Sequence, residues 1–377
     1  MRLIVLGSIV ALSICGISRA DETQCFFRIK STATTHITAL DASGVATWSN
    51  ELVGGTCIWE SASSLTAPWG EFAPCLVTGT VMSLRLVNIE LPRIMIPVPA
   101  GNFEMGNCMD GEGGGDELPV RTVYVSAFSM DQDDVTKEQW DAVYNWALAH
   151  GYDFYGDGSA PVGQGKGADH PVQTVNWYDC VKWCNARSEM EGQVPAYYTS
   201  EDQSEVYRTG QIDLANGSVK WQGGGYRLPT EAEWEKAARG GTSGHRFPWS
   251  DSDMISWDFA NYWSLPCDYD ANPLTGNNPI YDDYEPFTSP MKSFPANGYG
   301  VYDMAGNVTQ WCWDRYGSYS PGDTSDPHGP ASSDLARVSR GGSWIDSATG
   351  CRVAARNSSQ PTIYASNLGF RAVRSAQ

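Results

Sequence analysis

Glycine and proline recur every few residues from about residue 93 onward, and they limit how much regular structure can form there. The 377 residues include 39 Gly and 21 Pro, alongside 15 Trp, 18 Tyr and 11 Phe. Helix and strand interiors tolerate Gly and Pro poorly, whereas the many aromatic side chains can supply a core. We therefore expect a loop-rich, irregular globular fold of the α+β class, rather than a helix bundle or a disordered chain.

Three short segments within this region carry helix-start signals. Each begins with Thr or Asn, which can cap backbone N–H groups, and two have Gln or Glu three residues later, which completes a capping box. Glycine follows each segment and is placed to end it. The predicted helices are 136–151, capped by Thr136 and Gln139; 176–192, capped by Asn176; and 231–239, capped by Thr230 and Glu233.

The charge balance excludes one large class of partners. Acidic residues outnumber basic residues by 44 to 25, which gives a formal net charge of −19. Phosphate backbones and anionic membranes are bound by clustered Lys and Arg. We therefore expect no nucleic-acid partner.

The first twenty residues have the pattern of a secretory signal peptide. Arg2 precedes the mainly apolar segment Leu3–Ile17, and Ser18–Ala20 offers small residues at the cleavage positions before Asp21. An uncleaved anchor is the alternative, and Cys15 lies in a poor lipidation motif. No later segment is apolar for long enough to span a bilayer. We expect an exported protein, periplasmic, cell-surface or secreted, without a membrane span after cleavage.

Residues 21–92 differ from the rest of the chain in their pattern of apolar and polar residues. Short runs alternate between apolar and polar residues, with Gly, Asp and Ser between them, which is typical of antiparallel strands. No catalytic constellation occurs here, so we interpret the segment as a small β-rich domain that serves as a spacer or docking module. The runs are Cys25–Ile29, Thr35–Leu40, Val45–Trp48 and Val81–Val87.

Export changes the interpretation of the cysteines, because thiols pair in an oxidising compartment. No CxxC pair occurs and the histidines lack zinc-ligand spacing, so a structural zinc site is not expected. Cys180 and Cys184 lie on one helical face, where we favour structural thiols over a redox pair. Nine cysteines remain after cleavage: Cys25, Cys57, Cys75, Cys108, Cys180, Cys184, Cys267, Cys312 and Cys351.

Six motifs occur in a fixed order between residues 93 and 374. They are Pro97–Gly106, Pro171–Trp177, Tyr226–Glu235, Asn297–Val308, Arg340–Trp344 and Asn367–Arg371. This set resembles the sulfatase-modifying factor family, whose best-known activity is that of the formylglycine-generating enzyme. The resemblance implies a variant of the C-type lectin fold over residues 93–374.

The same resemblance locates the expected catalytic residues. Active members carry two cysteines after a Gly-Gly-Ser motif, and the pair binds Cu(I), which uses oxygen to oxidise a sulfatase cysteine. Counting from Ser343, the first position is Asp346 and the second is Cys351. Counting back from the later Ala-Ala-Arg motif, the chain is about three residues short and Cys351 matches neither position. A carboxylate is a hard ligand and does not replace a thiolate on Cu(I), so copper is not expected.

The resemblance also implies two calcium sites, because Ca²⁺ prefers carboxylate, amide and carbonyl oxygens. The first maps onto Asn261, the carbonyl of Tyr262, Asp283 and the carbonyl of Glu285. Asp282 replaces Asp283 if the loop alignment shifts by one, and a solvated loop is the alternative interpretation.

The second calcium site maps onto Asp303, the carbonyls of Gly306 and Val308, and Gln310, where an acid is usual. Losing that charge should weaken this site, so the first set is the better candidate. Both sites are expected to be structural.

Three residues in the last quarter of the chain, Arg352, Arg356 and Arg371, could form buried ion pairs as readily as they could bind a substrate. For Cys351 we expect a structural role, with a disulfide to Cys312 as the guessed pairing.

These features favour an exported, non-catalytic binding or scaffold member of the family. Its partner would be a sulfatase, another exported protein or peptide, or a polysaccharide. The alternative is an active formylglycine-generating oxidase, in which Cys351 and Ser343 would be catalytic.

Overall fold

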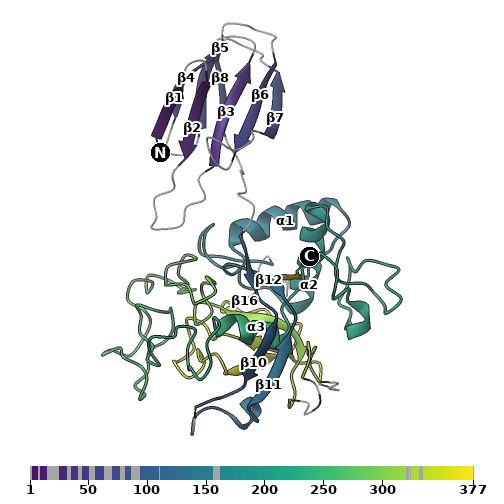
Figure 1. The fold of residues 1–377 in the computed structure, drawn as a ribbon, viewed down its shortest axis with the longest axis vertical. Helices are drawn as coiled ribbons and strands as arrows, with labels where there is room; N and C mark the ends of the chain where they lie inside the picture. Colours follow the sequence, from purple (N-terminus) through teal and green to yellow (C-terminus); the bar gives the residue numbers. More distant parts are fainter. Residues whose placement is uncertain are drawn as a thin grey trace. The chain divides into compact units, whose positions relative to one another are not determined.

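The computed structural model describes residues 94–376, apart from 110, 156–161, 320, 321, 323 and 331–333, and the backbone of the strands before residue 86. The chain divides between Pro92 and Arg93 into two units, which are drawn in Figure 1.

The first unit consists of antiparallel strands in two sheets. One sheet has the order β1-β2-β3-β6-β7, and the other has the order β4-β5-β8. The strands are β1 Arg2–Leu6, β2 Ile9–Ile14, β3 Cys25–Ser31, β4 Thr35–Leu40, β5 Val45–Asn50, β6 Thr56–Ala62, β7 Gly70–Leu76 and β8 Val81–Arg85. Strands β1 and β2 fall within the predicted signal peptide, whose expected cleavage junction lies outside the described residues.

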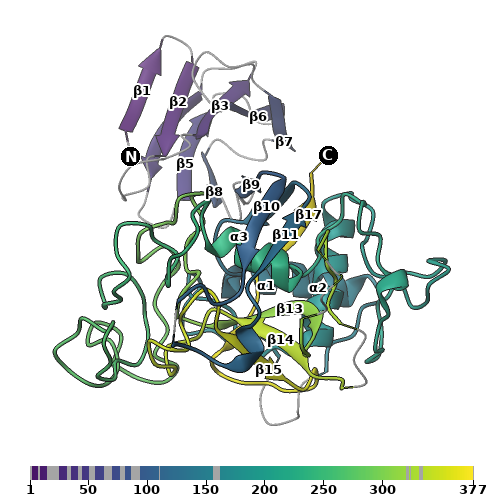
Figure 2. The same ribbon diagram turned by 60° about the horizontal axis from the view of Figure 1, so that its bottom comes forward.

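The second unit contains three small sheets, of orders β10-β11, β17-β12-β9 and β15-β14-β13-β16. All pairings are antiparallel except β13 with β16. The strands are β9 Met95–Val98, β10 Gly101–Met105, β11 Arg121–Val125, β12 Phe128–Asp131, β13 Thr309–Arg315, β14 Arg337–Arg340, β15 Arg356–Ser359, β16 Leu368–Gly369 and β17 Val373–Ser375. Long irregular segments connect them (Figure 2), as expected for an α+β, loop-rich fold.

The three predicted helices are confirmed. They are α1 Lys137–Ala149, α2 Trp177–Met190 and α3 Glu231–Ala238, and two 3₁₀ turns lie at Gly115–Glu117 and Asn216–Ser218. Both capping boxes form: Thr136 N donates to Gln139 Oε1 (3.0 Å), and Thr230 N donates to Glu233 Oε2 (2.8 Å). Such caps satisfy backbone groups within one turn, which is why the sequence alone located these helices.

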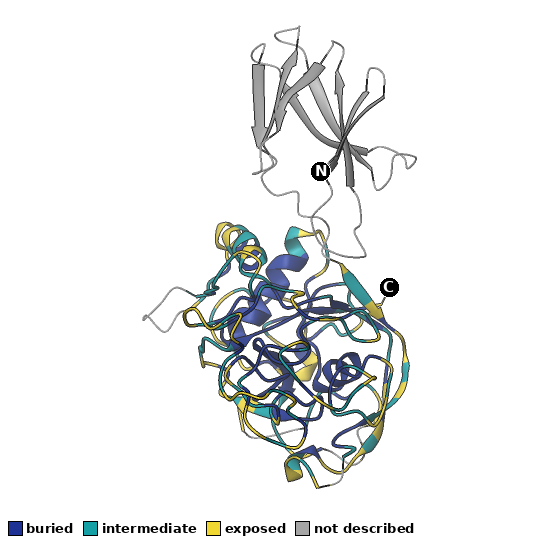
Figure 3. Ribbon diagram, turned by 90° about the vertical axis from the view of Figure 1, so that its left-hand side faces the viewer, coloured by how far each residue is buried: buried dark blue, intermediate teal, exposed yellow. Residues whose placement is uncertain are grey.

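The core of the second unit is divided into three clusters of buried side chains. The largest holds α1 and α2 together through Trp140 and Trp183, whose rings stack with 6.1 Å between centroids, while Phe370 meets both edge-on. Every residue of α3 is buried, and α2 is buried from Trp177 to Ser188, whereas α1 buries only Trp140, Val143 and Ala147. Figure 3 shows this difference in burial across the second unit. Lys236 of α3 donates to the carbonyl of Gly101 at the start of β10 (2.8 Å).

The predicted disulfide between Cys312 and Cys351 is wrong. The two residues are free thiols that pack in different core clusters, Cys312 beneath α3 and Cys351 beside Tyr262. The other described cysteines of this unit also form no disulfide, namely Cys108, Cys180, Cys184 and Cys267. Cys180 and Cys184 are fully buried, in agreement with the structural role favoured from the sequence.

Among the described residues, no helix combines the length and the apolar composition needed to cross a membrane.

Candidate functional site

The turn after β14 brings the predicted catalytic residues together. Gly341 and Gly342 have φ values of 96° and 68°, and a Cβ on Gly342 would lie 2.8 Å from Cys351 Sγ. Only glycine tolerates this close approach and this backbone conformation. The turn therefore places the Cys351 thiol directly against the backbone that leads into Ser343.

The Ser343 hydroxyl makes two hydrogen bonds, one within this turn and one to a distant residue. Its Oγ donates to Asp346 Oδ2 (2.5 Å) and accepts from Asn367 Nδ2 (3.1 Å). The backbone of Asp346 is also fixed, because its carbonyl accepts a hydrogen bond from Trp263 N (3.0 Å). Asp346, at the position of the first copper cysteine, thus fixes the serine hydroxyl by a charge-assisted hydrogen bond.

Cys351 lies in an environment that disfavours its thiolate. The residue has no solvent-exposed surface and belongs to a cluster that includes Phe247, Ile255 and Tyr262. Burial raises the pKa of the Cys351 thiol well above its usual value, and the charge of Asp346 raises it further. Copper binding and nucleophilic chemistry both need the thiolate, which this burial disfavours.

A second thiol near this cluster was missed from the sequence. Cys267 packs, partly buried, against the side chains that surround Cys351. The hydroxyl of Tyr262, in the same cluster, donates to Asp270 Oδ1 (2.7 Å). Burial and this carboxylate raise the pKa of Tyr262, and Cys351 and Cys267 add smaller contributions in the same direction. No local motif marks Cys267, because a long irregular segment brings it to the cluster.

The first predicted calcium set is only partly assembled. Asn261 Nδ2 donates to the carbonyl of Phe287 (2.7 Å), which holds this buried residue against the segment that follows Glu285. The carbonyl of Tyr262 accepts from Trp257 Nε1 (3.2 Å). The Asp283 side chain, 57% exposed, instead pairs with Lys166.

Lys166 was not predicted as part of this site. Its side chain is 7% exposed, and its ammonium group donates to the Asp283 carboxylate and to the Tyr284 carbonyl (3.2 Å). The same ammonium group lies 4.4 Å from the centre of the Tyr284 ring. The oxygens of this loop thus hold an internal cation.

In the second predicted set, the Gln310 side chain is already engaged by protein groups. Gln310 Oε1 accepts from Trp234 Nε1 (2.7 Å) and from Arg371 Nε (2.8 Å), so both of its lone pairs are used. Gln310 Nε2 donates to the Asp303 carbonyl (2.9 Å). The backbone pairing of Gly306 with Asn261 brings the two predicted sets side by side, with Val308 immediately before β13. Among the residues that the structure describes, no group of three His, Cys, Asp or Glu side chains is arranged to hold a metal ion.

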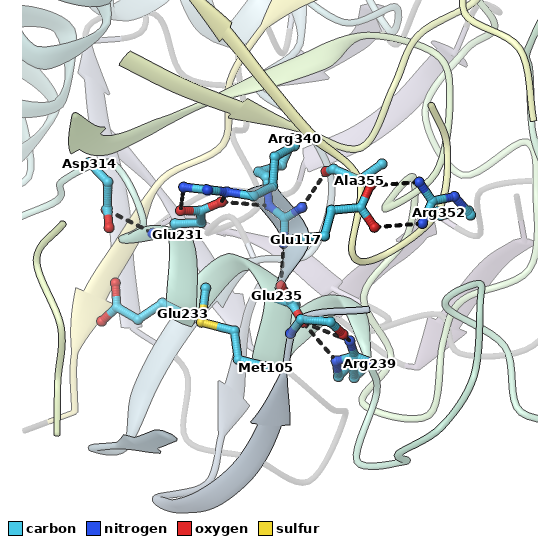
Figure 4. A network of polar contacts seen from close by, with 12 residues as sticks. Met105, Glu117, Glu231, Glu233, Glu235, Arg239, Asp314, Arg340, Arg352 and Ala355 are labelled. Atoms are coloured by element: carbon cyan, nitrogen blue, oxygen red, sulfur yellow. Dashed lines mark hydrogen bonds and ion pairs between the residues drawn. The ribbon is translucent and has the colours of Figure 1, made fainter. Parts of the chain in front are cut away.

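The arginines near the end of the chain form buried ion pairs, as the first interpretation of them predicted. Figure 4 shows Arg352 at Glu117 of the 3₁₀ turn Gly115–Glu117, and Arg239 and Arg340 at Glu235 of α3. Arg352 binds Glu117 through two hydrogen bonds of 2.8 and 2.7 Å, and Arg356 binds Glu231 through two of 2.6 and 2.8 Å. The other pairs are Arg227–Glu233, Arg239–Glu235, Arg340–Glu235 and Arg371–Asp134. Arg340, Arg352, Arg356 and Arg371 connect distant segments of the domain, because their carboxylate partners lie more than 100 residues away. Arg227 and Arg239 pair with carboxylates within six residues of them.

The family of the chain follows from comparison with known proteins. Residues 87–376 match the model of the sulfatase-modifying factor enzyme 1-like domain. The chain belongs to this family, as its six motifs predicted.

Relatives in this family include enzymes and proteins with other names. The chaperone protein LppX of Paenibacillus barcinonensis is 32% identical over 68% of this chain and 82% of its own length. The formylglycine-generating enzyme of Streptomyces coelicolor is 33% identical over 75% of this chain and 90% of its own length. The inactive Cα-formylglycine-generating enzyme 2 of mouse is 31% identical over 75% and 86%.

Solved structures agree with the fold. Treponema denticola variable protein 1 matches with a TM-score of 0.54 and 31% identity, over 75% of this chain and 95% of that protein. PvdO from Pseudomonas aeruginosa matches with a TM-score of 0.55 and 26% identity, over 75% of this chain and 94% of that protein.

Proposed function

We propose that the domain from residue 93 onward is a non-catalytic binding member of the sulfatase-modifying factor family. One observation carries this proposal: the Cys351 side chain has no exposed surface, while the partner position holds Asp346, whose carboxylate accepts a hydrogen bond from Ser343. A Cu(I) site needs two accessible soft ligands. One buried thiol beside a hard carboxylate does not supply them.

The domain then retains the family scaffold without the oxidase chemistry. Its exported context rests on the signal-peptide pattern, and the C-type lectin variant of the fold rests on the family resemblance. The partner is a sulfatase, another exported protein or peptide, or a polysaccharide. The similarity to a protein named as a chaperone supports a protein partner over a polysaccharide.

The alternative function is a formylglycine-generating oxidase, supported by the 33% identity to the Streptomyces coelicolor enzyme. In this alternative Cys267, which packs against the Cys351 cluster, would supply the second thiolate. Oxygen uptake with Cu(I) and a cysteine-containing sulfatase peptide distinguishes the two functions. We expect no uptake above the rate of a protein-free control.

Two substitutions sharpen this test. If the wild-type protein consumes oxygen and both Cys351→Ser and Cys267→Ser abolish the reaction, the oxidase function is correct and the scaffold proposal fails. Cys108→Ser is the matched control, because Cys108 is a free thiol that does not belong to the Cys351 cluster.

Calcium is proposed at the first set, in competition with Lys166. Asn261 and the segment around Glu285 are already adjacent, and the loop already holds a cation on Asp283 and Tyr284. Calcium would add structural stability there by mass action. Added calcium should raise the melting temperature, and Asp283→Ala should remove most of that increase. A melting temperature that responds to neither calcium nor chelator would refute the site.

A further inference from the structure

The backbone pairing of the first unit places two cysteines directly opposite each other. In the antiparallel pair of β6 and β7 (Figure 1), Cys57 lies opposite Cys75. Opposite residues in such a pair lie on the same face of the sheet, with Cα atoms about 4.5 or 5.5 Å apart according to their place in the hydrogen-bond ladder. Both separations fall within the range of about 4.4–6.8 Å that disulfide-linked residues show. The register therefore meets the backbone condition for a disulfide.

The third cysteine of this unit lies too far along the sheet to compete. Strand β3 pairs with β6 on the side away from β7, and Ser31 of β3 lies opposite Cys57. Cys25 lies at the other end of this seven-residue strand, about 20 Å from Ser31 at the usual rise of a strand. Strand β7, which carries Cys75, is one strand further away. The sheet thus leaves only the pairing of Cys57 with Cys75 within bonding range in this unit.

Strand β7 is the element that such a bond would hold in place. The order β1-β2-β3-β6-β7 makes it an edge strand, which pairs within this sheet with β6 alone. It also contains Pro74, next to Cys75, which has no N–H to contribute to a ladder. The pair of β6 and β7 lies outside the predicted signal peptide, whereas β1 and β2 fall within it. A covalent link at this position would fasten the exposed edge of the sheet that remains after cleavage.

We propose that Cys57 and Cys75 form a disulfide bond that fastens β7 to β6. As the S–S bond forms, the two thiols pass two protons and two electrons to the oxidant, another disulfide, whose own S–S bond breaks to give two thiols. The bond closes the loop between residues 57 and 75, so it limits the conformations of the unfolded chain and stabilises the folded unit. Its formation in the cell rests on the exported context proposed above, because an oxidising compartment preserves disulfides.

Peptide mapping of the purified full-length protein tests the pairing without depending on export. The protein is incubated with reduced and oxidised glutathione, alkylated in denaturant without reductant, and cleaved after glutamate. This cleavage places the three cysteines on separate peptides, 23–51, 52–60 and 72–90. We expect 52–60 joined to 72–90, with 23–51 alkylated. Alkylation of both Cys57 and Cys75, or linkage of either one to any other thiol, overturns the proposal.

The same mapping on protein alkylated at the moment of cell lysis tests the exported context separately. A link between Cys57 and Cys75 in this material supports both the pairing and the oxidising compartment. A link that forms in the glutathione buffer but is missing from the cell-derived protein supports the pairing and contradicts the exported context. The two proposals can therefore fail independently.

Stability measurements test what the bond does. Reductant should lower one melting transition of the wild-type protein by at least about 5 °C in scanning calorimetry, because it removes the constraint on the unfolded chain. Cys75→Ser should melt like the reduced wild type and should not respond to reductant. Cys25→Ser is the matched control and should keep both the bond and the response. A wild-type protein whose transitions ignore reductant would overturn the fastening role.

Discussion

Replacing Glu235 by Gln tests whether the buried ion pairs stabilise the domain. Glu235 has no exposed surface and serves two guanidinium groups at once. Its Oε1 accepts from Arg239 (2.7 and 3.0 Å) and from Gly106 N (2.8 Å), and its Oε2 accepts from Arg340. The substitution keeps the volume of the side chain, so the change in stability reports on charge and hydrogen bonding alone.

The expected loss follows from the charge that remains. Arg340 also lies 3.5 Å from Glu231, but Arg239 has Glu235 as its ion-pair partner in the described structure. Breaking a buried pair from one side costs about 3–5 kcal/mol, because the other charge stays desolvated. We therefore expect Glu235→Gln to lower the free energy of unfolding of the domain by about 3–5 kcal/mol at pH 7.

Chemical denaturation monitored by tryptophan fluorescence measures this loss. Asp141→Asn is the matched control: Asp141 pairs with Lys137 one helical turn away, and its side chain is 45% exposed. An exposed pair of this kind should cost only about 0.3–0.5 kcal/mol. If Glu235→Gln costs no more than Asp141→Asn, the network does not stabilise the fold and the reasoning fails.

The effect should also depend on pH. Burial alone would raise the pKa of Glu235, but Arg239 and Arg340 outweigh it and hold the pKa below the ordinary value of 4.5. A carboxylate with a depressed pKa stabilises the folded state above its unfolded pKa, and this contribution is lost as the pH falls. The difference between wild type and Glu235→Gln should therefore narrow below about pH 4.5.

Three further predictions concern single positions. Burial raises the pKa of Asp179 to about 6 from 3.8 despite Lys182, so the folded state holds this proton more tightly than the unfolded state. The stability of Asp179→Asn relative to wild type should consequently rise by roughly 2 kcal/mol between pH 4 and 7 in denaturation curves, and a constant difference would contradict this. Gly306→Ala should cost at least about 2 kcal/mol, since φ is +75° and the new Cβ would lie 2.3 Å from Asn261 O. Gly151→Ala, at φ +84° with open space around it, isolates the backbone cost, and equal losses would exclude the clash. Intact-mass measurement of exported protein should give Asp21 as the first residue, and retention of residues 1–20 would exclude cleavage.

Several features of the candidate site could be predicted from the sequence, but their connections could not. The motifs located Ser343, Asp346 and Cys351 in one turn, because they follow a Gly-Gly pair within a few residues. The sequence did not show that Gln310 Oε1 is occupied by Trp234 and Arg371, which are 76 and 61 residues away. Whether the side-chain oxygen at such a position can bind a metal ion depends on which distant donors occupy it in the folded structure.

The disulfide prediction failed for a related reason. Export favours disulfide formation, and nine cysteines leave at least one thiol unpaired. Neither fact shows which cysteines pack in the same core cluster of the folded chain. Cys312 faces the cluster beneath α3, whereas Cys351 faces the Tyr262 cluster, and Cys267 joins the latter from an irregular segment.

The sequence by itself determined the family, the loop-rich α+β class and the three helices. Each helix start is specified within four residues, as when Thr230 and Glu233 satisfy each other's backbone groups. Only the tertiary structure decided the partners of the buried charges, since Arg356 meets Glu231 across 125 residues and Arg352 meets Glu117 across 235. Many different ion pairs between the acidic and basic residues are compatible with the sequence. The packing of the folded chain selects one set, because it brings only those charges close enough to pair.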